Sequence, residues 1–107
     1  MASKKDYLEF VLEQLSGLSD ISYRAMMGEY IIYYKGRITG GIYDDRFLVK
    51  ITPSSEMLLN GAPLETPYEG AKQMLLVEDI ENRELLENLF TAMYDELPEP
   101  AKRKKRS

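Results

Sequence analysis

Four short β-rich segments joined by tight turns restrict the fold of this chain more than any other feature. They are Ile21–Met26, Tyr30–Tyr34, Arg37–Tyr43 and Arg46–Ile51. Lys35-Gly36 and Asp44-Asp45 form two of the connections, and Gly and Asp tolerate the positive φ that a two-residue turn requires. Because connections this short can only join antiparallel neighbours, the sequence predicts an antiparallel meander from about Ile21 to Ile51.

Helical patterns precede and follow this meander. Apolar residues at i, i+3, i+4 and i+7 predict an amphipathic helix over Asp6–Ser16, with Ser3 or Asp6 as its N-cap. Thr52 followed by Pro53 is a typical helix start, and we expect this short helix to stop at Asn60-Gly61.

The last third of the chain predicts one more strand and one more helix. Ala62–Gly70 contains two prolines and is predicted to be a loop, and Gln73–Val77 is predicted to be a strand. Asn82 can cap a final helix that runs to about Glu96. We therefore expect a two-layer α+β fold with an antiparallel sheet of about five strands. The predicted order is N-terminal helix, β-meander, short helix, strand and C-terminal helix.

The chain has no Cys and no His, which excludes thiol nucleophiles, Ser–His–Asp triads, His bases and zinc-finger sites within it. We therefore expect a non-enzymatic protein without a cofactor. No apolar run approaches the roughly 20 residues that a membrane-spanning helix needs, and no signal-peptide pattern is present. These features predict a cytoplasmic location. A length of 107 residues predicts one domain over residues 1–100.

Basic residues gather in a short tail, residues 101–107, that we expect to be disordered. It holds the candidate nucleic-acid contacts Lys102, Arg103, Lys104, Lys105 and Arg106. These are five of the chain's 14 basic residues. The rest of the chain contains nine basic and 18 acidic residues. An acidic body repels phosphate, so any nucleic-acid binding through this tail is predicted to be weak and sensitive to salt.

Two features of the meander have both a structural and a functional interpretation. Met26-Met27-Gly28 joins two strands, and its methionines can either fill the core or form an adaptable contact surface. Tyrosines also cluster in the meander and can pack across strands or stack on single-stranded bases. They are Tyr23, Tyr30, Tyr33, Tyr34 and Tyr43.

A set of short motifs in order resembles the N-terminal domain of the TfoX/Sxy competence regulators. The motifs are Arg24-Ala25-Met26-Met27-Gly28-Glu29-Tyr30, Tyr33-Tyr34-Lys35-Gly36, Gly40-Gly41-Ile42, Asp44-Asp45, Leu48-Val49-Lys50 and Gly61-Ala62-Pro63, followed by Tyr68 and Met74. Met27 stands where that family usually has Phe. The resemblance implies a two-layer α+β fold and a role in transcriptional control of competence genes alongside a DNA-bound activator.

Three functions remain open at this point: a regulatory or adaptor domain that acts through protein contacts, a weak nucleic-acid binder, and a small-molecule binder. The candidate interaction surface comprises Arg24, Met27, Gly28, Tyr30 and Lys50. Arg24 and Lys50 are charged residues within strand-like segments, so each must face solvent or find a partner. Both a monomer and a homodimer are compatible with the sequence.

Overall fold

The structure, a computed structural model, describes residues 4–98 and confirms the α+β class. Its elements, in chain order, are α1 (Lys5–Gln14), β1 (Ile21–Met26), β2 (Glu29–Tyr34), β3 (Arg37–Ile42), β4 (Phe47–Val49), α2 (Pro53–Leu58), β5 (Leu64–Glu65), β6 (Met74–Leu76) and α3 (Arg83–Tyr94). The predicted disordered tail, residues 101–107, lies outside the described residues. Within the described part of the chain, no helix is long and apolar enough to cross a membrane.

The strands form one antiparallel sheet in the order β1-β2-β3-β4-β6-β5. The predicted meander is confirmed as β1 to β4. The sheet has six strands rather than about five, because the predicted loop Ala62–Gly70 contains the two-residue strand β5. Leu64 and Glu65 pair with Leu75 and Met74 of β6, so this strand exists through pairing and not through a β-rich sequence of its own.

The tight turns adopt the backbone that the sequence predicts. Lys35 and Gly36 have φ of 52° and 84°, the values of a type I′ hairpin turn. Asp44 and Asp45 have φ of 55° and 57°. Both predicted turns are therefore in the left-handed region, and together they set the register of β2, β3 and β4.

Helix caps are confirmed at two of the three helices. Thr52 and Ser55 form a reciprocal capping box at α2, and Asn82 accepts a hydrogen bond from the Leu85 N–H of α3. The expectation for α1 is wrong, because its N-cap is Lys4, whose side chain makes no capping bond. The Lys4 N–H instead donates to Asp45 Oδ1 at 2.9 Å, which ties the start of α1 to a turn of the sheet.

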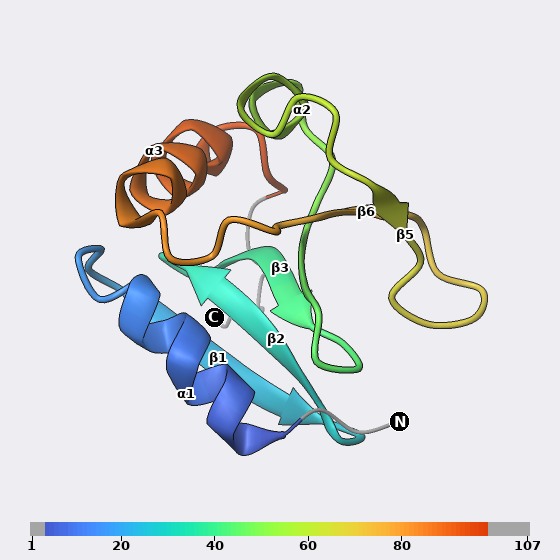
Figure 1. The fold of residues 1–107 in the computed structure, drawn as a ribbon. Coiled ribbons are helices and arrows are strands. Elements are labelled where there is room, and N and C mark those ends of the chain that lie inside the picture. The colour runs from blue at the N-terminus through green and yellow to red at the C-terminus, as the bar shows by residue number, and fades with distance from the viewer. Residues whose placement is uncertain (1–3, 99–107) are drawn as a thin grey trace, which may run out of the picture.

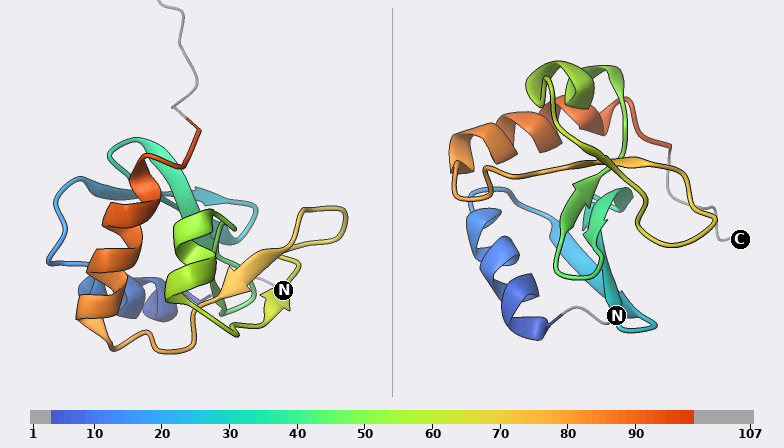
Figure 2. Two further views of the ribbon diagram at one scale, coloured as in Figure 1. Left: turned by 90° about the horizontal axis from the view of Figure 1, so that it is seen from above. Right: turned by 45° about the vertical axis from the view of Figure 1, so that its right-hand side comes forward.

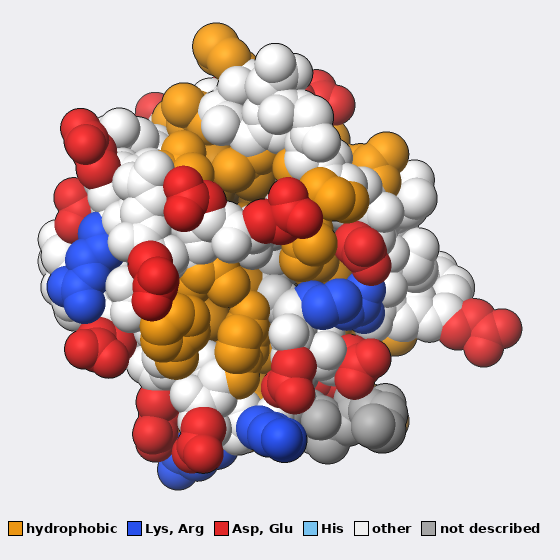
Figure 3. All heavy atoms as spheres, viewed as in Figure 1, with side chains coloured by type: hydrophobic (Ala, Val, Ile, Leu, Met, Phe, Trp, Pro, Cys, Tyr) orange, Lys and Arg blue, Asp and Glu red, His pale blue; other side chains and the backbone are white. Residues whose placement is uncertain are grey.

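The core lies between one face of the sheet and the helices, which all gather on that side (Figures 1 and 2). Fully buried apolar residues come from α1, from the sheet and from α3. The largest are Leu8, Leu15, Ile32, Ile42, Phe47, Leu86, Leu89 and Phe90. Figure 3 shows that acidic side chains are spread over the outside of this helical layer, with few basic ones between them.

The Gly40-Gly41 pair makes close approaches possible inside the sheet. A Cβ on Gly40 would collide with the Leu48 carbonyl oxygen of β4 and lie 2.9 Å from the Val49 Cα. A Cβ on Gly41 would lie 2.7 Å from the Tyr43 ring. Both glycines therefore allow neighbouring backbone to approach β3 closely: β4 at Gly40, and at Gly41 the Tyr30 carbonyl oxygen, 2.6 Å from the added Cβ.

Candidate functional site

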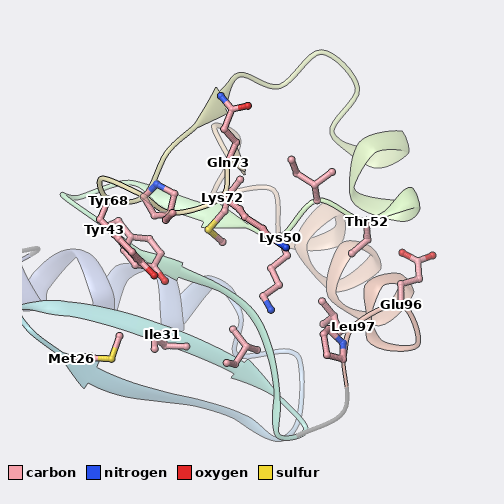
Figure 4. Close-up of a pocket in the computed structure, with 16 residues that line it drawn as sticks. Met26, Ile31, Tyr43, Lys50, Thr52, Tyr68, Lys72, Gln73, Glu96 and Leu97 are labelled. Carbon is pink, nitrogen blue, oxygen red and sulfur yellow. The ribbon is translucent and has the colours of Figure 1, made fainter. Parts of the chain in front are cut away.

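Within residues 4–98, no helix covers the second face of the sheet, which forms the floor of a groove of about 760 Å³. Met26 of β1, Ile31 of β2, Ile38 of β3, and Lys50 and Ile51 after β4 line its floor. Figure 4 shows Met26 and Ile31 on the sheet below the groove, with Tyr68 and Lys72 above it. We call this feature the open-face groove.

Strand alternation decides which residues face this groove. Ile31 and Ile32 are neighbours in β2, so Ile32 enters the core while Ile31 lies on the open face. The same alternation places Val49 in the core and Lys50 on the open face. A strand that is apolar at consecutive positions therefore supplies both surfaces of the sheet.

The segment between β5 and β6 forms the opposite wall of the groove. Tyr68, which is 59% exposed, packs against the buried Tyr43 with ring centroids 6.1 Å apart. Burial, and to a smaller extent the neighbouring Tyr68, raises the pKa of the Tyr43 hydroxyl. The Tyr43 hydroxyl therefore stays neutral near pH 7, and the two rings act as apolar surface with polar tips.

Arg46 fastens this wall to the sheet. Its guanidinium donates to the Glu65 carboxylate at 2.6 Å, to the Tyr43 carbonyl at 3.0 Å and to the Thr66 carbonyl at 3.4 Å. One side chain thereby joins the turn before β4 to β5 and to the residue that follows it. The wall is held by this network although β5 itself has only two residues.

The groove carries charge of both signs at different places. Among the described residues, neither the Lys50 nor the Lys72 amine has a carboxylate within ion-pair distance. Glu96, at the end near α2 and α3, accepts hydrogen bonds from the Ser54 hydroxyl at 2.6 Å and the Ser54 N–H at 3.0 Å. The Ser54 hydroxyl, with smaller help from Thr52 and the Ser54 N–H, lowers the pKa of Glu96. The groove therefore carries two amines without an ion-pair partner among the described residues and, at one end, a hydrogen-bonded carboxylate.

The sequence-predicted interaction residues separate in the structure. Lys50 lines the groove. Arg24 is exposed on the same face, opposite Ile31 in the β1–β2 register, but does not line the groove. Tyr30 lies on the other face, where it packs against the core and against Tyr23 at a ring distance of 5.9 Å. A pocket shared by Arg24, Tyr30 and Lys50 therefore does not form.

Met27 and Gly28 form the turn at the tip of the β1–β2 hairpin. The interpretation that Met26 and Met27 fill the core is wrong, because Met26 is 44% and Met27 95% exposed. Met27 has φ of 53°, a conformation in which Asn, Asp or Gly is usual. Met27 is therefore a large apolar side chain outside the core, held on a left-handed backbone.

The tyrosine cluster does not make one stacking platform for bases. Tyr23, Tyr30 and Tyr34 lie on the helix side of the sheet, and Tyr33 and Tyr43 lie on the open face. Tyr34 and Tyr43 are buried. The candidate nucleic-acid contacts Lys102 to Arg106 lie outside the described residues.

Sequence reasoning did not find most of the groove. Its lining comes from β1, β2, β3, the residues after β4, the segment before β6 and the residues that follow α3, which are spread over most of the chain. One usable signal was present in Ile31-Ile32, where consecutive apolar residues require an apolar position on each face. No group of three or more Asp or Glu residues within 4–98 is placed to hold a metal ion. The groove is suited to an apolar group that carries a negative charge.

The fold and the groove define a small α+β domain with one helix-covered and one open sheet face. The family model described as the TfoX N-terminal domain matches residues 13–98, so the chain belongs to that family. It is also similar to a protein of Spirochaeta aurantia named "Uncharacterized 12.7 kDa protein in trpE 5'region". The two are 29% identical over 105 residues, which cover 97% of this chain and 91% of that protein. No solved structure matches the chain.

Proposed function

We infer that this domain is a non-enzymatic regulatory adaptor whose open-face groove binds a segment of a partner protein. The segment would carry apolar side chains for the floor of the groove and at least one carboxylate for Lys50 and Lys72. By its family, the expected partner is a transcriptional activator that itself binds DNA. The observation that carries the proposal is the pairing of an apolar floor with two amines that have no carboxylate partner among the described residues.

The physical argument for a protein partner starts from the apolar side chains and amines that the groove leaves exposed to solvent. Met26, Ile38 and Ile51 are between 37% and 44% exposed and lie on one concave surface. Contiguous apolar surface with a polar rim is typical of protein contact sites. The amines add selectivity, since a partner that presents Lys or Arg would be repelled while one that presents Asp or Glu would be attracted.

The proposal is tested by capturing partners from the native cell with the wild-type chain and with two charge-matched variants. Lys50→Glu reverses charge inside the groove, and Lys5→Glu makes the same change on the exposed face of α1. We expect a reproducible partner that is retained by Lys5→Glu and lost with Lys50→Glu. Calorimetry with the purified partner should then show affinity reduced by roughly tenfold or more for Lys50→Glu only.

Two results would contradict the proposal in different ways. A partner retained by both variants would place the contact elsewhere on the domain and reject the groove. The absence of any reproducible partner at native expression would argue against a function through protein contacts.

A further inference from the structure

The outer edge of β1 is a long, unpaired strand edge. In the sheet order β1 is terminal, and five of its six residues are exposed. Within the described residues, no strand pairs with β1 other than β2. Its backbone groups on the outer side are therefore available to a further strand.

The structure shows which backbone groups point outward. The Lys35 N–H donates to the Asp20 carbonyl at 2.9 Å, so Asp20 and every second residue after it face β2. The two-residue turn at Met27-Gly28 requires the same alternation, because the residues that flank such a turn, Met26 and Glu29, form a hydrogen-bonded backbone pair. The N–H and C=O groups of Ile21, Tyr23 and Ala25 consequently point to the free edge.

The two edges of the sheet differ in how they are protected. β5, the opposite edge, has only two residues and lies between Pro63 and Pro67. Short strands and prolines are common means by which proteins block unwanted pairing. β1 has six residues and no proline, and its sole charged side chain is Arg24. An edge of this kind is typical of a strand that pairs with a partner.

We propose that β1 pairs antiparallel with β1 of a second copy of this chain, with Tyr23 opposite Tyr23 of the partner subunit. The dimer would then contain one continuous sheet. This register places Ile21 opposite Ala25 of the partner subunit, so the residues with free backbone groups meet one another. All three outward-facing residues of each strand thereby become hydrogen-bonded pairs.

The side chains also fit this register. Arg24 is opposite the neutral Ser22 of the partner subunit, and its diagonal neighbours are Asp20 and Arg24 of the partner subunit, so no like charges lie directly opposite each other. The register with Arg24 opposite itself has the same backbone phase but would place two like charges directly opposite each other, which disfavours it. A second copy thus fits this edge in backbone phase and opposes no like charges directly. This inference is independent of the proposed groove function.

Light scattering during size-exclusion chromatography, from low micromolar to near-millimolar concentration, measures the association. We expect a mass that approaches twice the 12.4 kDa of the chain. Ala25→Pro removes one outward N–H and should give a monomer, whereas Ala25→Ser keeps that N–H and should remain a dimer. Circular dichroism checks that both variants are folded.

Single cysteines test the register directly, because the chain has no cysteine of its own. In the proposed dimer two Tyr23→Cys residues face each other with Cα atoms about 5.5 Å apart, within the range of disulfides. Two Arg24→Cys residues are diagonal neighbours, about 7–8 Å apart with somewhat closer Cβ atoms, which is beyond the roughly 3.5–4.5 Å between the Cβ atoms of an unstrained disulfide. Mild oxidation should therefore cross-link Tyr23→Cys roughly tenfold faster than Arg24→Cys.

A chain that stays monomeric at the highest concentration overturns the proposal. So does a dimer in which the two cysteines cross-link at equal rates, since another surface would then hold it. If Ala25→Pro does not fold, the comparison of the two cysteines still decides the matter.

Discussion

The two faces of the sheet are built from the same strands but differ in what covers them. On the helix side, Ile32, Phe47 and Phe90 are completely buried between strands and helices. On the open face, Ile38 and Met26 remain more than a third exposed although both are apolar. The helix side holds the core, whereas the open side leaves several apolar side chains partly exposed to solvent. Substitutions on the two faces should therefore separate stability from binding.

The largest effect is expected where the helix side is packed most tightly. Phe90 is fully buried in α3, with its ring 6.2 Å from Phe47 and 6.1 Å from Tyr34. Phe90→Ala should lower the free energy of unfolding by about 3–5 kcal/mol, because it leaves a cavity as well as losing buried area. Urea unfolding measures the change.

Ile38→Ala is the matched test on the open face. Because Ile38 is already partly exposed, its loss should cost less than about 1 kcal/mol. Equal destabilisation by Phe90→Ala and Ile38→Ala would show that the two faces contribute alike to the free energy of unfolding. It would then no longer be justified to assign binding to the open face.

A somewhat smaller loss is expected from Gly40→Ala, which tests the packing of β3 against β4. The new Cβ would meet the backbone of Leu48 and Val49, which cannot move without opening the strand pair. We expect about 3 kcal/mol of destabilisation. Gly17→Ala is the control, because the atoms near its Cβ belong to the side chain of Glu87, which can rotate away. Similar losses in both variants would contradict the backbone explanation.

Arg37 joins the sheet to the end of α3 and should have an intermediate effect. Its guanidinium lies 4.1 Å from the Tyr94 ring centroid and donates to the Tyr94 carbonyl at 2.8 Å and the Leu97 carbonyl at 3.3 Å. A cation at a helix C-terminus also complements the helix dipole. Arg37→Met should cost about 2 kcal/mol, whereas the exposed Arg24→Met should leave the melting temperature nearly unchanged. The reverse order would assign Arg24 a structural role.

Local chemistry made much of the fold predictable. Thr52 and Asn82 are predictable as N-caps because a side-chain oxygen directly before a helix accepts a hydrogen bond from a backbone N–H of the first turn. Lys35-Gly36 and Asp44-Asp45 were identified because their residue types suit positive φ. β5 was missed because its hydrogen bonds depend on β6, about ten residues further along. Pairing of this kind leaves little trace in a two-residue segment.

The candidate site was harder to predict for a related reason. Lys50 is predictable as a site residue because a charged residue within a strand must face solvent or find a partner. It lines the groove. Tyr30 was grouped with it because sequence spacing does not reveal which face of a sheet a residue occupies when both faces are apolar. Arg37 was overlooked because its partners, Tyr94 and Leu97, lie almost 60 residues away.

A smaller effect concerns Glu96, at the end of the groove. Its pKa is lower in the folded chain, so the stability it adds is fully present above the unfolded pKa, near 4.5, and is lost as pH falls through the folded value. The melting temperatures of wild type and Glu96→Gln should therefore differ at pH 6 and converge as the pH falls below 4.5 and through the folded pKa. Glu9→Gln, on the exposed side of α1, controls for loss of a carboxylate. A constant difference across this range would contradict the contribution of Ser54.

The smallest change in stability, and one of opposite sign, is expected at Met27. Asn is favoured over Met at φ near 53°, so Met27→Asn should stabilise the fold by about 0.5 kcal/mol. Lys35→Asn is its match, since Lys35 occupies the equivalent position of the next hairpin with φ of 52°. In the proposed dimer Met27 ends the paired strand and reaches the segment before β1 of the partner subunit. Met27→Asn should therefore weaken self-association by light scattering, and Lys35→Asn should not. If both leave association unchanged, the exposed methionine has no part in that contact, and strain at this turn needs another explanation.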